Sequence, residues 1–313
     1  MSFRVFVRIV ITAAVLLSST TAYADVLKPY VLGDTPPGDL NQVAGKVRQA
    51  LASHGFEVVG SYAPYPGAIV ICATNQELKA AAAKAKNGGF GAAQRVAVTE
   101  AKGKLQVSYV NPEYLGIAYG LGKLEGVSAA LKTALGANKT FGSKGIPAEK
   151  LGPGEYHYGM LMPYFQDVDL LRDYPDYKTA VETVEKNLAA GAGGTVRVYR
   201  IDLPGKEVSV FGVGIPTGAI DGPGKGDKDT DKEIMDIVDW QELRHTAFLP
   251  YELMVTGGRI IALRGRYRIA LHFPDTTMTG AHGFTKITTA PFGIMVALEA
   301  ASGFKRDLPT RNE

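Results

Sequence analysis

Histidine and methionine side chains in the second half of the chain are the first residues whose types could do chemistry. The candidate metal ligands are His157, His272, Met278 and His282. Imidazole and thioether groups together suit copper or haem iron, so one hypothesis is a copper or haem site built from these residues. The competing interpretation, which the sequence favours, is that the methionines fill cores and the histidines are ordinary surface residues.

Three alternating aspartates form a second candidate site. Asp227, Asp229 and Asp231 imitate the start of a calcium-binding loop. The pattern then fails, because Lys232 stands where such loops have glycine and Val238 where they have a bidentate glutamate. A solvated loop that ends in a helix cap is therefore the favoured interpretation.

Acid–histidine pairs are a third possibility for chemistry. Glu242 with His245, and Asp275 with His272, have the residue types of general acid–base catalysis. The chain has no G-x-S-x-G, H-E-x-x-H, Walker or C-x-x-C motif. The single cysteine, Cys72, lies in an apolar strand pattern, where we expect a small buried side chain.

Tyrosines gather around the predicted hairpin ends and the middle of the chain, where they could line a groove. We take Tyr109 and Tyr158, together with His245 just before a predicted strand, as the candidate ligand-binding residues. The alternative is plain packing of aromatic residues in sheets.

Hairpins are the elements that must position these residues. Arg95–Pro112 alternates apolar and polar residues around a turn at Gly103, which predicts a β-hairpin. Arg259–Pro274 shows the same spacing around Gly265, and Arg197–Pro216 is a looser copy. In the second hairpin, His272 falls on the face opposite Tyr267, Ile269 and Leu271, so we expect it to face solvent or a peripheral site.

The N-terminus has the features of a secretory signal peptide. Arg4 and Arg8 precede an apolar run, and Ala22-Tyr23-Ala24 is a cleavage pattern, which predicts cleavage after Ala24. The expected product is a soluble periplasmic or secreted protein without membrane insertion. The chain has 34 Lys+Arg and 31 Asp+Glu, so removing the two arginines leaves 32 against 31. A charge this balanced gives no electrostatic case for nucleic acid.

The element pattern predicts an α+β protein of two tandem helix–hairpin–helix–hairpin–helix repeats that form a pseudo-two-fold pair. The predicted parts are a signal peptide (1–24), a linker (25–39), a first repeat (40–136), a connector (137–172), a second repeat (173–303) with an insertion (214–231), and a tail (304–313). Within the connector, Glu155–Phe165 is expected to be a strand.

One part of this pattern resembles a known family. A strand, Gly103-Lys104, and a strand that ends in Asn111-Pro112, preceded by a helix and the strand HGFEVV, are similar to the bacterial domain-of-unknown-function 302 family. The resemblance covers about Leu40–Gly136 and, in divergent form, Tyr174–Gly303. It implies small α+β domains, and it implies no activity or catalytic residues.

The leading functional hypothesis is an exported binding or accessory protein without catalysis. Its ligand would lie between the repeats or under the loops of the second repeat, and a protein partner is left open. The alternative is the copper or haem protein, and a hydrolase-like enzyme comes third.

Overall fold

The computed structural model describes residues 26–217, 230–304 and 306. The predicted signal peptide lies outside the described residues, as do Asp227 and Asp229. In the described part of the chain, no helix is both long enough and apolar enough to cross a membrane.

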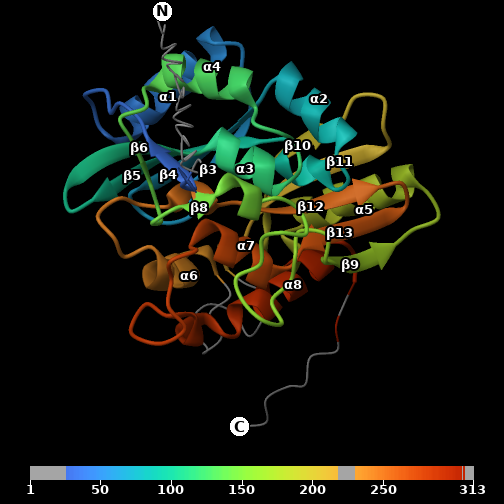
Figure 1. The fold of residues 1–313 in the computed structure, drawn as a ribbon. Helices are drawn as coiled ribbons and strands as arrows, with labels where there is room; N and C mark the ends of the chain where they lie inside the picture. Colours follow the sequence, from blue (N-terminus) through green and yellow to red (C-terminus); the bar gives the residue numbers. More distant parts are fainter. Residues whose placement is uncertain (1–25, 218–229, 305, 307–313) are drawn as a thin grey trace, which may run out of the picture.

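The first half is built on a six-stranded antiparallel sheet with the strand order β3-β4-β5-β6-β2-β7 (Figure 1). Its elements are β1 (Val26–Leu27), β2 (Tyr30–Leu32), α1 (Leu40–Ser53), β3 (Glu57–Tyr62), β4 (Ala68–Thr74), α2 (Gln76–Lys84), η1 (Gly88–Gly91), β5 (Gln94–Ala101), β6 (Lys104–Val110), α3 (Pro112–Ala118), α4 (Glu125–Leu135), β7 (Lys139–Phe141), β8 (Ile146–Pro147) and η2 (Ala148–Lys150). Strands β1 and β8 form a separate antiparallel pair.

The second half is built on a five-stranded antiparallel sheet with the order β10-β11-β12-β13-β9. Its elements are β9 (Val168–Asp173), α5 (Tyr177–Ala189), η3 (Ala192–Gly194), β10 (Val196–Asp202), β11 (Val208–Gly214), α6 (Asp231–Val238), η4 (Thr246–Phe248), β12 (Tyr251–Thr256), β13 (Arg259–Leu263), α7 (Gly265–His272), η5 (Phe284–Ile287) and α8 (Ala290–Ala301).

The predicted α+β class matches the structure, but the predicted architecture is wrong. The described residues form three sheets of two, six and five strands and eight α-helices, and this is not a helix–hairpin–helix repeat fold. Strands that the prediction lacked are integral to the sheets, because β2 pairs with both β6 and β7, and β9 pairs with β13. The predicted linker therefore contains strands, and so does the predicted connector, although Glu155–Phe165 is not one of them.

The hairpin predicted over Arg259–Pro274 is the clearest local error. The true turn is at Gly257-Gly258, between β12 and β13, and Gly265 begins helix α7. The alternation of Tyr267, Ile269 and Leu271 suggested a strand. Every residue of helix α7 except Arg266 is buried, so its other polar residues do not mark a solvent face.

The hairpin around Gly103 follows the prediction. Strands β5 and β6 pair in register across Ala101 and Lys104, and Gly103 has a φ of +74°, which favours glycine. Asp39 and Asn75 cap α1 and α2, because their side chains accept hydrogen bonds from backbone N–H groups of the first turns.

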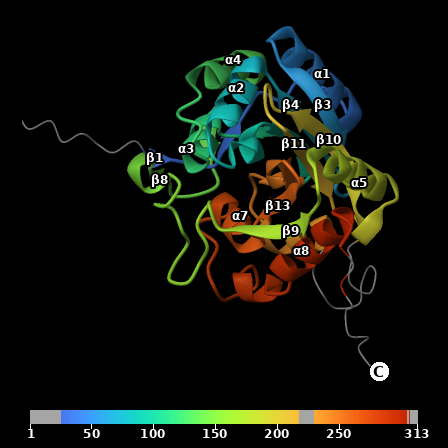
Figure 2. The same ribbon diagram turned by 90° about the vertical axis from the view of Figure 1, so that its right-hand side faces the viewer.

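Helices and sheets form layers. Helices α1 and α4 cover the outer face of the first sheet, and α5 lies against β10, β11, β12 and β13 of the second (Figures 1 and 2). Between the sheets, the short turn η1 of the first half contacts β11 and β12, while η4 of the second half contacts β4, β5 and β6. Each half therefore places a turn against the sheet of the other half.

Strands β3 and β10 also meet closely. A Cβ atom added at Gly60 in β3 would overlap the carbonyl oxygen of Val198 in β10 and would lie 3.2 Å from Tyr199 Cβ. Only a residue without a side chain allows this approach of two backbones.

We predict that Gly60→Ala destabilises the protein by about 1–3 kcal/mol, because the new methyl group meets backbone rather than a movable side chain. Gly45→Ala is the matched control. Gly45 lies inside α1 with nothing within 4 Å of an added Cβ, so alanine there should stabilise by about 0.5–1 kcal/mol. Urea unfolding measures both changes, and an unchanged stability of Gly60→Ala would contradict this packing.

Candidate functional site

The predicted metal ligands lie in separate surroundings. His272 is fully buried in α7, contrary to the expectation that it faces solvent, whereas Met278 is 56% exposed. The Nδ1 atom of His157 lies 2.7 Å from the carbonyl oxygen of Gly159. These side chains do not form one site.

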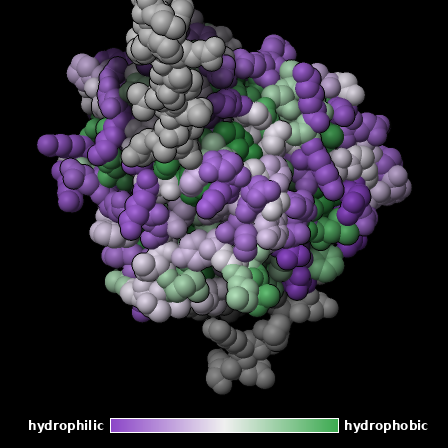
Figure 3. All heavy atoms as spheres, viewed as in Figure 1, coloured by the Kyte–Doolittle hydropathy of each residue, from purple (hydrophilic) through white to green (hydrophobic). Residues whose placement is uncertain are grey.

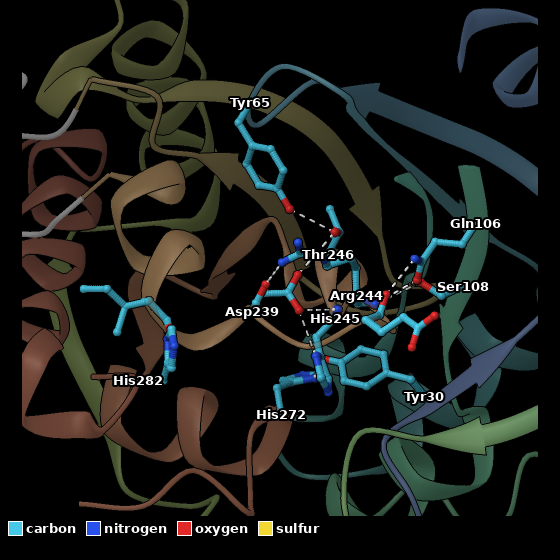
Figure 4. Close-up of polar contacts among 12 residues, drawn as sticks. Tyr30, Tyr65, Gln106, Ser108, Asp239, Arg244, His245, Thr246, His272 and His282 are labelled. Atoms are coloured by element: carbon cyan, nitrogen blue, oxygen red, sulfur yellow. Dashed lines mark hydrogen bonds and ion pairs between the residues drawn. The ribbon is translucent and has the colours of Figure 1, made fainter. Parts of the chain in front are cut away.

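His282 contacts other residues, Ile237 and Trp240. Its Nδ1 atom lies 2.9 Å from the carbonyl oxygen of Ile237, and its ring stacks on Trp240 with centroids 4.6 Å apart. Figure 4 shows His282 well apart from His272. In residues 26–217 and 230–304, no group of three or more histidine, cysteine, aspartate or glutamate side chains could hold a metal ion.

The other predicted sites also have structural partners. Tyr109 is buried and its hydroxyl donates to the carbonyl oxygen of Gly136, while Tyr158 donates to that of Thr276. Asp275 accepts a hydrogen bond from the backbone N–H of Lys144, and within the described residues it forms none with His272.

Asp231 does not lie in the solvated loop that the sequence favoured, because it begins helix α6. It is fully buried and accepts hydrogen bonds from Tyr62 and from the backbone N–H of Ile215. Burial raises the pKa of its carboxyl to about 6. Cys72 is buried as expected, and burial raises the pKa of its thiol.

A buried ionic network joins the two halves. Arg95 of β5 donates from Nη1 to Glu252 of β12 at 2.5 Å and from Nε to the carbonyl oxygen of Ala247 at 3.0 Å. Arg268 of α7 donates to the other oxygen of Glu252 at 2.8 Å and to the carbonyl oxygen of Phe248 at 2.7 Å. All three charged side chains are at most 2% exposed. We call Arg95, Glu252 and Arg268 the junction network.

His272 extends this network to Tyr30 in strand β2 of the six-stranded sheet. Arg95 Nη2 lies 3.2 Å from His272 Nε2, and Tyr30 OH lies 3.0 Å from His272 Nδ1. A guanidinium can only donate, so Nε2 is the acceptor and the imidazole is neutral with its proton on Nδ1. Burial, the Arg95 and Arg268 cations and His245 lower the pKa of His272 well below its ordinary value.

His245 is paired with an aspartate that the sequence analysis did not single out. Asp239, which follows α6, accepts from the backbone N–H of His245 at 2.8 Å and lies 2.9 Å from its Nδ1 (Figure 4). The expected partner, Glu242, instead offers its backbone carbonyl to Gln106. Within the described part of the chain, His245 Nε2 is buried without a hydrogen-bond partner.

A pocket of about 390 Å³ opens next to Asp239, between the two halves. We call it the inter-sheet pocket. Its lining residues are Tyr65, Thr99, Glu100, Met235, Asp236, Asp239, Trp240 and Arg244. Those from the first half come from β5 and the turn before β4, and those from the second come from α6 and the segment that follows it.

Two lining groups are unpartnered within the described residues. Thr99 is 2% exposed and its hydroxyl has no hydrogen bond. The carboxylate of Glu100 has no ion pair or side-chain hydrogen bond there. Arg244 donates to the backbone carbonyl of Asp239, and Tyr65 OH lies 2.9 Å from Thr246 Oγ1. Burial raises the pKa of Tyr65, so its phenol stays neutral.

Comparison with known proteins finds no relative of this chain. No family model, curated protein or solved structure gives a significant match to the chain. The resemblance to the domain-of-unknown-function 302 family therefore stays a prediction.

The low pKa of His272 gives the stability of the protein a defined pH dependence. The unfolded histidine binds a proton near pH 6.5, whereas the folded one does so only at much lower pH. The contribution of neutral His272 is therefore complete above about pH 6.5 and falls by about 1.4 kcal/mol per pH unit below it. His272→Gln should lose this part of the pH dependence.

The measurement is the difference in free energy of unfolding between wild type and His272→Gln, taken from about pH 8 to about pH 5. The raised pKa of Asp231 has the opposite effect, since its protonation stabilises the folded state as pH falls through about 6. This effect is present in both proteins and cancels in the difference. Parallel curves for the two proteins would show that His272 is not held neutral.

Proposed function

We propose that this protein is an exported binding protein for a small organic cation, which it holds in the inter-sheet pocket without catalysis. The observation that carries the proposal is the convergence of three groups on that pocket: the unpaired Glu100 carboxylate, the buried Thr99 hydroxyl and the exposed Trp240 indole. An ammonium group could pair with the first, donate to the second and lie against the third.

Charge favours a cation over an anion. The lining has three carboxylates, Glu100, Asp236 and Asp239, against the single guanidinium of Arg244. Asp236 forms an ion pair with Lys232 at 2.5 Å, and Asp239 is hydrogen-bonded to His245. Glu100 is therefore the carboxylate whose charge is left for a ligand.

Aromatic side chains add a second attraction. Trp240 is 53% exposed although it is large and apolar, and Tyr65 stands on the wall contributed by the first half. One face of the Trp240 indole stacks on His282, so a cation would lie on the other face. The face of an indole attracts a cation by about 0.5–2 kcal/mol, depending on how far the cation is desolvated. The volume of 390 Å³ suits a ligand at the small end of the usual range of roughly 300–1,000 Å³.

Support for a binding role without catalysis comes from the chemistry of the lining. Among the described residues, the lining of the inter-sheet pocket has no cysteine, serine, lysine or histidine, so Thr99 has no histidine beside it in the lining. The Asp239–His245 pair is behind the pocket wall, with His245 only 1% exposed. Export rests on the predicted signal peptide.

Titration with n-butylamine, an alkylammonium ion at neutral pH, tests the proposal directly. Trp240 is the single tryptophan of the chain, so its fluorescence reports on this pocket alone. We expect a saturable change with n-butylamine and none with n-butanol, which has a similar shape but no charge. Glu100→Gln should weaken binding about tenfold to a hundredfold, because it removes a charge-assisted hydrogen bond.

Glu182→Gln is the matched control for this variant. Glu182 is an exposed glutamate on α5 that pairs with Lys178 and does not line the pocket. Its replacement should leave the titration unchanged. Equal responses to n-butanol and n-butylamine, or an unchanged affinity in Glu100→Gln, would contradict the proposal.

A further inference from the structure

A second pocket lies under the loops of the second half, and its lining shares no residue with that of the inter-sheet pocket. It has a volume of about 250 Å³, and its lining is mostly apolar. The lining residues are Met162, Arg266, Ile269, Met278, Phe284, Ile287, Thr288 and Pro291. We call it the methionine pocket. Its two thioether side chains can adapt to the shape of an apolar chain.

Two exposed apolar residues directly precede Met162, a lining residue, in the sequence. Met160 and Leu161 precede the lining residue Met162 and are 89% and 94% exposed, and Leu161 has a φ of +66°. Figure 3 shows apolar surface on the lower part of the molecule, where the segments before β9 and before α8 run in Figure 1. The lining residue Met162 thus directly follows two exposed apolar residues in the chain.

Arg266 is the only charged residue among the described residues that line this pocket. Helix α7 and its cap carry three alternating arginines. Arg264 pairs with Asp169 at 3.2 Å and Arg268 with Glu252 at 2.8 Å. In the described part of the chain, the side chain of Arg266 has no ion pair or hydrogen bond. An exposed guanidinium at an apolar pocket is suited to a carboxylate.

The backbone adds to this preference for an anion. Arg266 is in the first turn of α7, and Pro291 is in the first turn of α8. The two helix starts touch, since a Cβ atom at Gly265 would lie 3.0 Å from Pro291 Cα. The N-terminal ends of helices carry partial positive charge, so both favour a negative group beside Arg266.

We propose that the methionine pocket binds a monocarboxylic acid with a short aliphatic chain. The chain lies among Met162, Met278 and Ile287, and the carboxylate pairs with Arg266. A cavity of this size is too small for a large lipid, and an esterified acyl chain has no free carboxylate to offer. This site is distinct from the organic-cation site, since the two linings share no residue.

Calorimetric titration with octanoate, octanol and acetate tests the inference. Octanoate should bind, whereas octanol lacks the charge and acetate lacks the chain, so each should bind at least about tenfold more weakly. Arg266→Gln should weaken octanoate binding about tenfold or more. Met278→Ser should also weaken octanoate binding, because it removes apolar area that the ligand chain contacts. Met278 is exposed, so this change should leave the fold intact.

Arg264→Gln is the matched control, because it removes a neighbouring arginine that does not line the pocket. It should bind octanoate like wild type, and so should Glu100→Gln from the other pocket. Absence of octanoate binding at millimolar concentration, equal binding of octanol, or an unchanged affinity in Arg266→Gln would each overturn the proposal. Thermal melting shows whether each variant is folded, and Arg266 is exposed enough that folding should persist.

Discussion

Two guanidinium groups buried with a single carboxylate constrain the centre of this protein. Arg95 and Arg268 both pair with Glu252, so one negative charge faces two positive charges away from water. Unpaired charge in such a place is strongly unfavourable. Backbone carbonyl oxygens complete the solvation, and those of Ala247 and Phe248 come from η4. The position of η4 against the first sheet is therefore tied to the need to solvate these cations.

The rest of the junction follows from this arrangement. His272 must be neutral, because its Nε2 faces Arg95, and its other nitrogen then bonds to Tyr30 of the first half. The segment before η4 is fixed by Asp239, which binds His245 and so holds the chain between α6 and η4. That segment forms one wall of the inter-sheet pocket, and β5, which carries Arg95, forms the other. The network that joins the halves thus also shapes the candidate site.

Local features were predictable from the sequence, and long-range ones were not. The turn at Gly103 depends on residues a few positions apart, so the pattern predicted it. Helix α7 was taken for a strand, because the burial of all its residues except Arg266 removes the helical period of polarity. The junction network pairs residues 157 positions apart, which no spacing rule reveals. The sequence signal for this network was a charged residue inside each of two apolar strands, Arg95 and Glu252, since a buried charge needs a partner of opposite charge.

The most direct test of this account measures how the cost of losing Glu252 depends on Arg95. Glu252→Gln should lower the free energy of unfolding by about 3–5 kcal/mol in wild type, because it leaves two buried cations without a carboxylate. In an Arg95→Met background only Arg268 remains, so the same change should cost clearly less. Urea unfolding of the four proteins gives both costs. Equal costs in the two backgrounds would contradict the claim that this shared carboxylate holds the halves together.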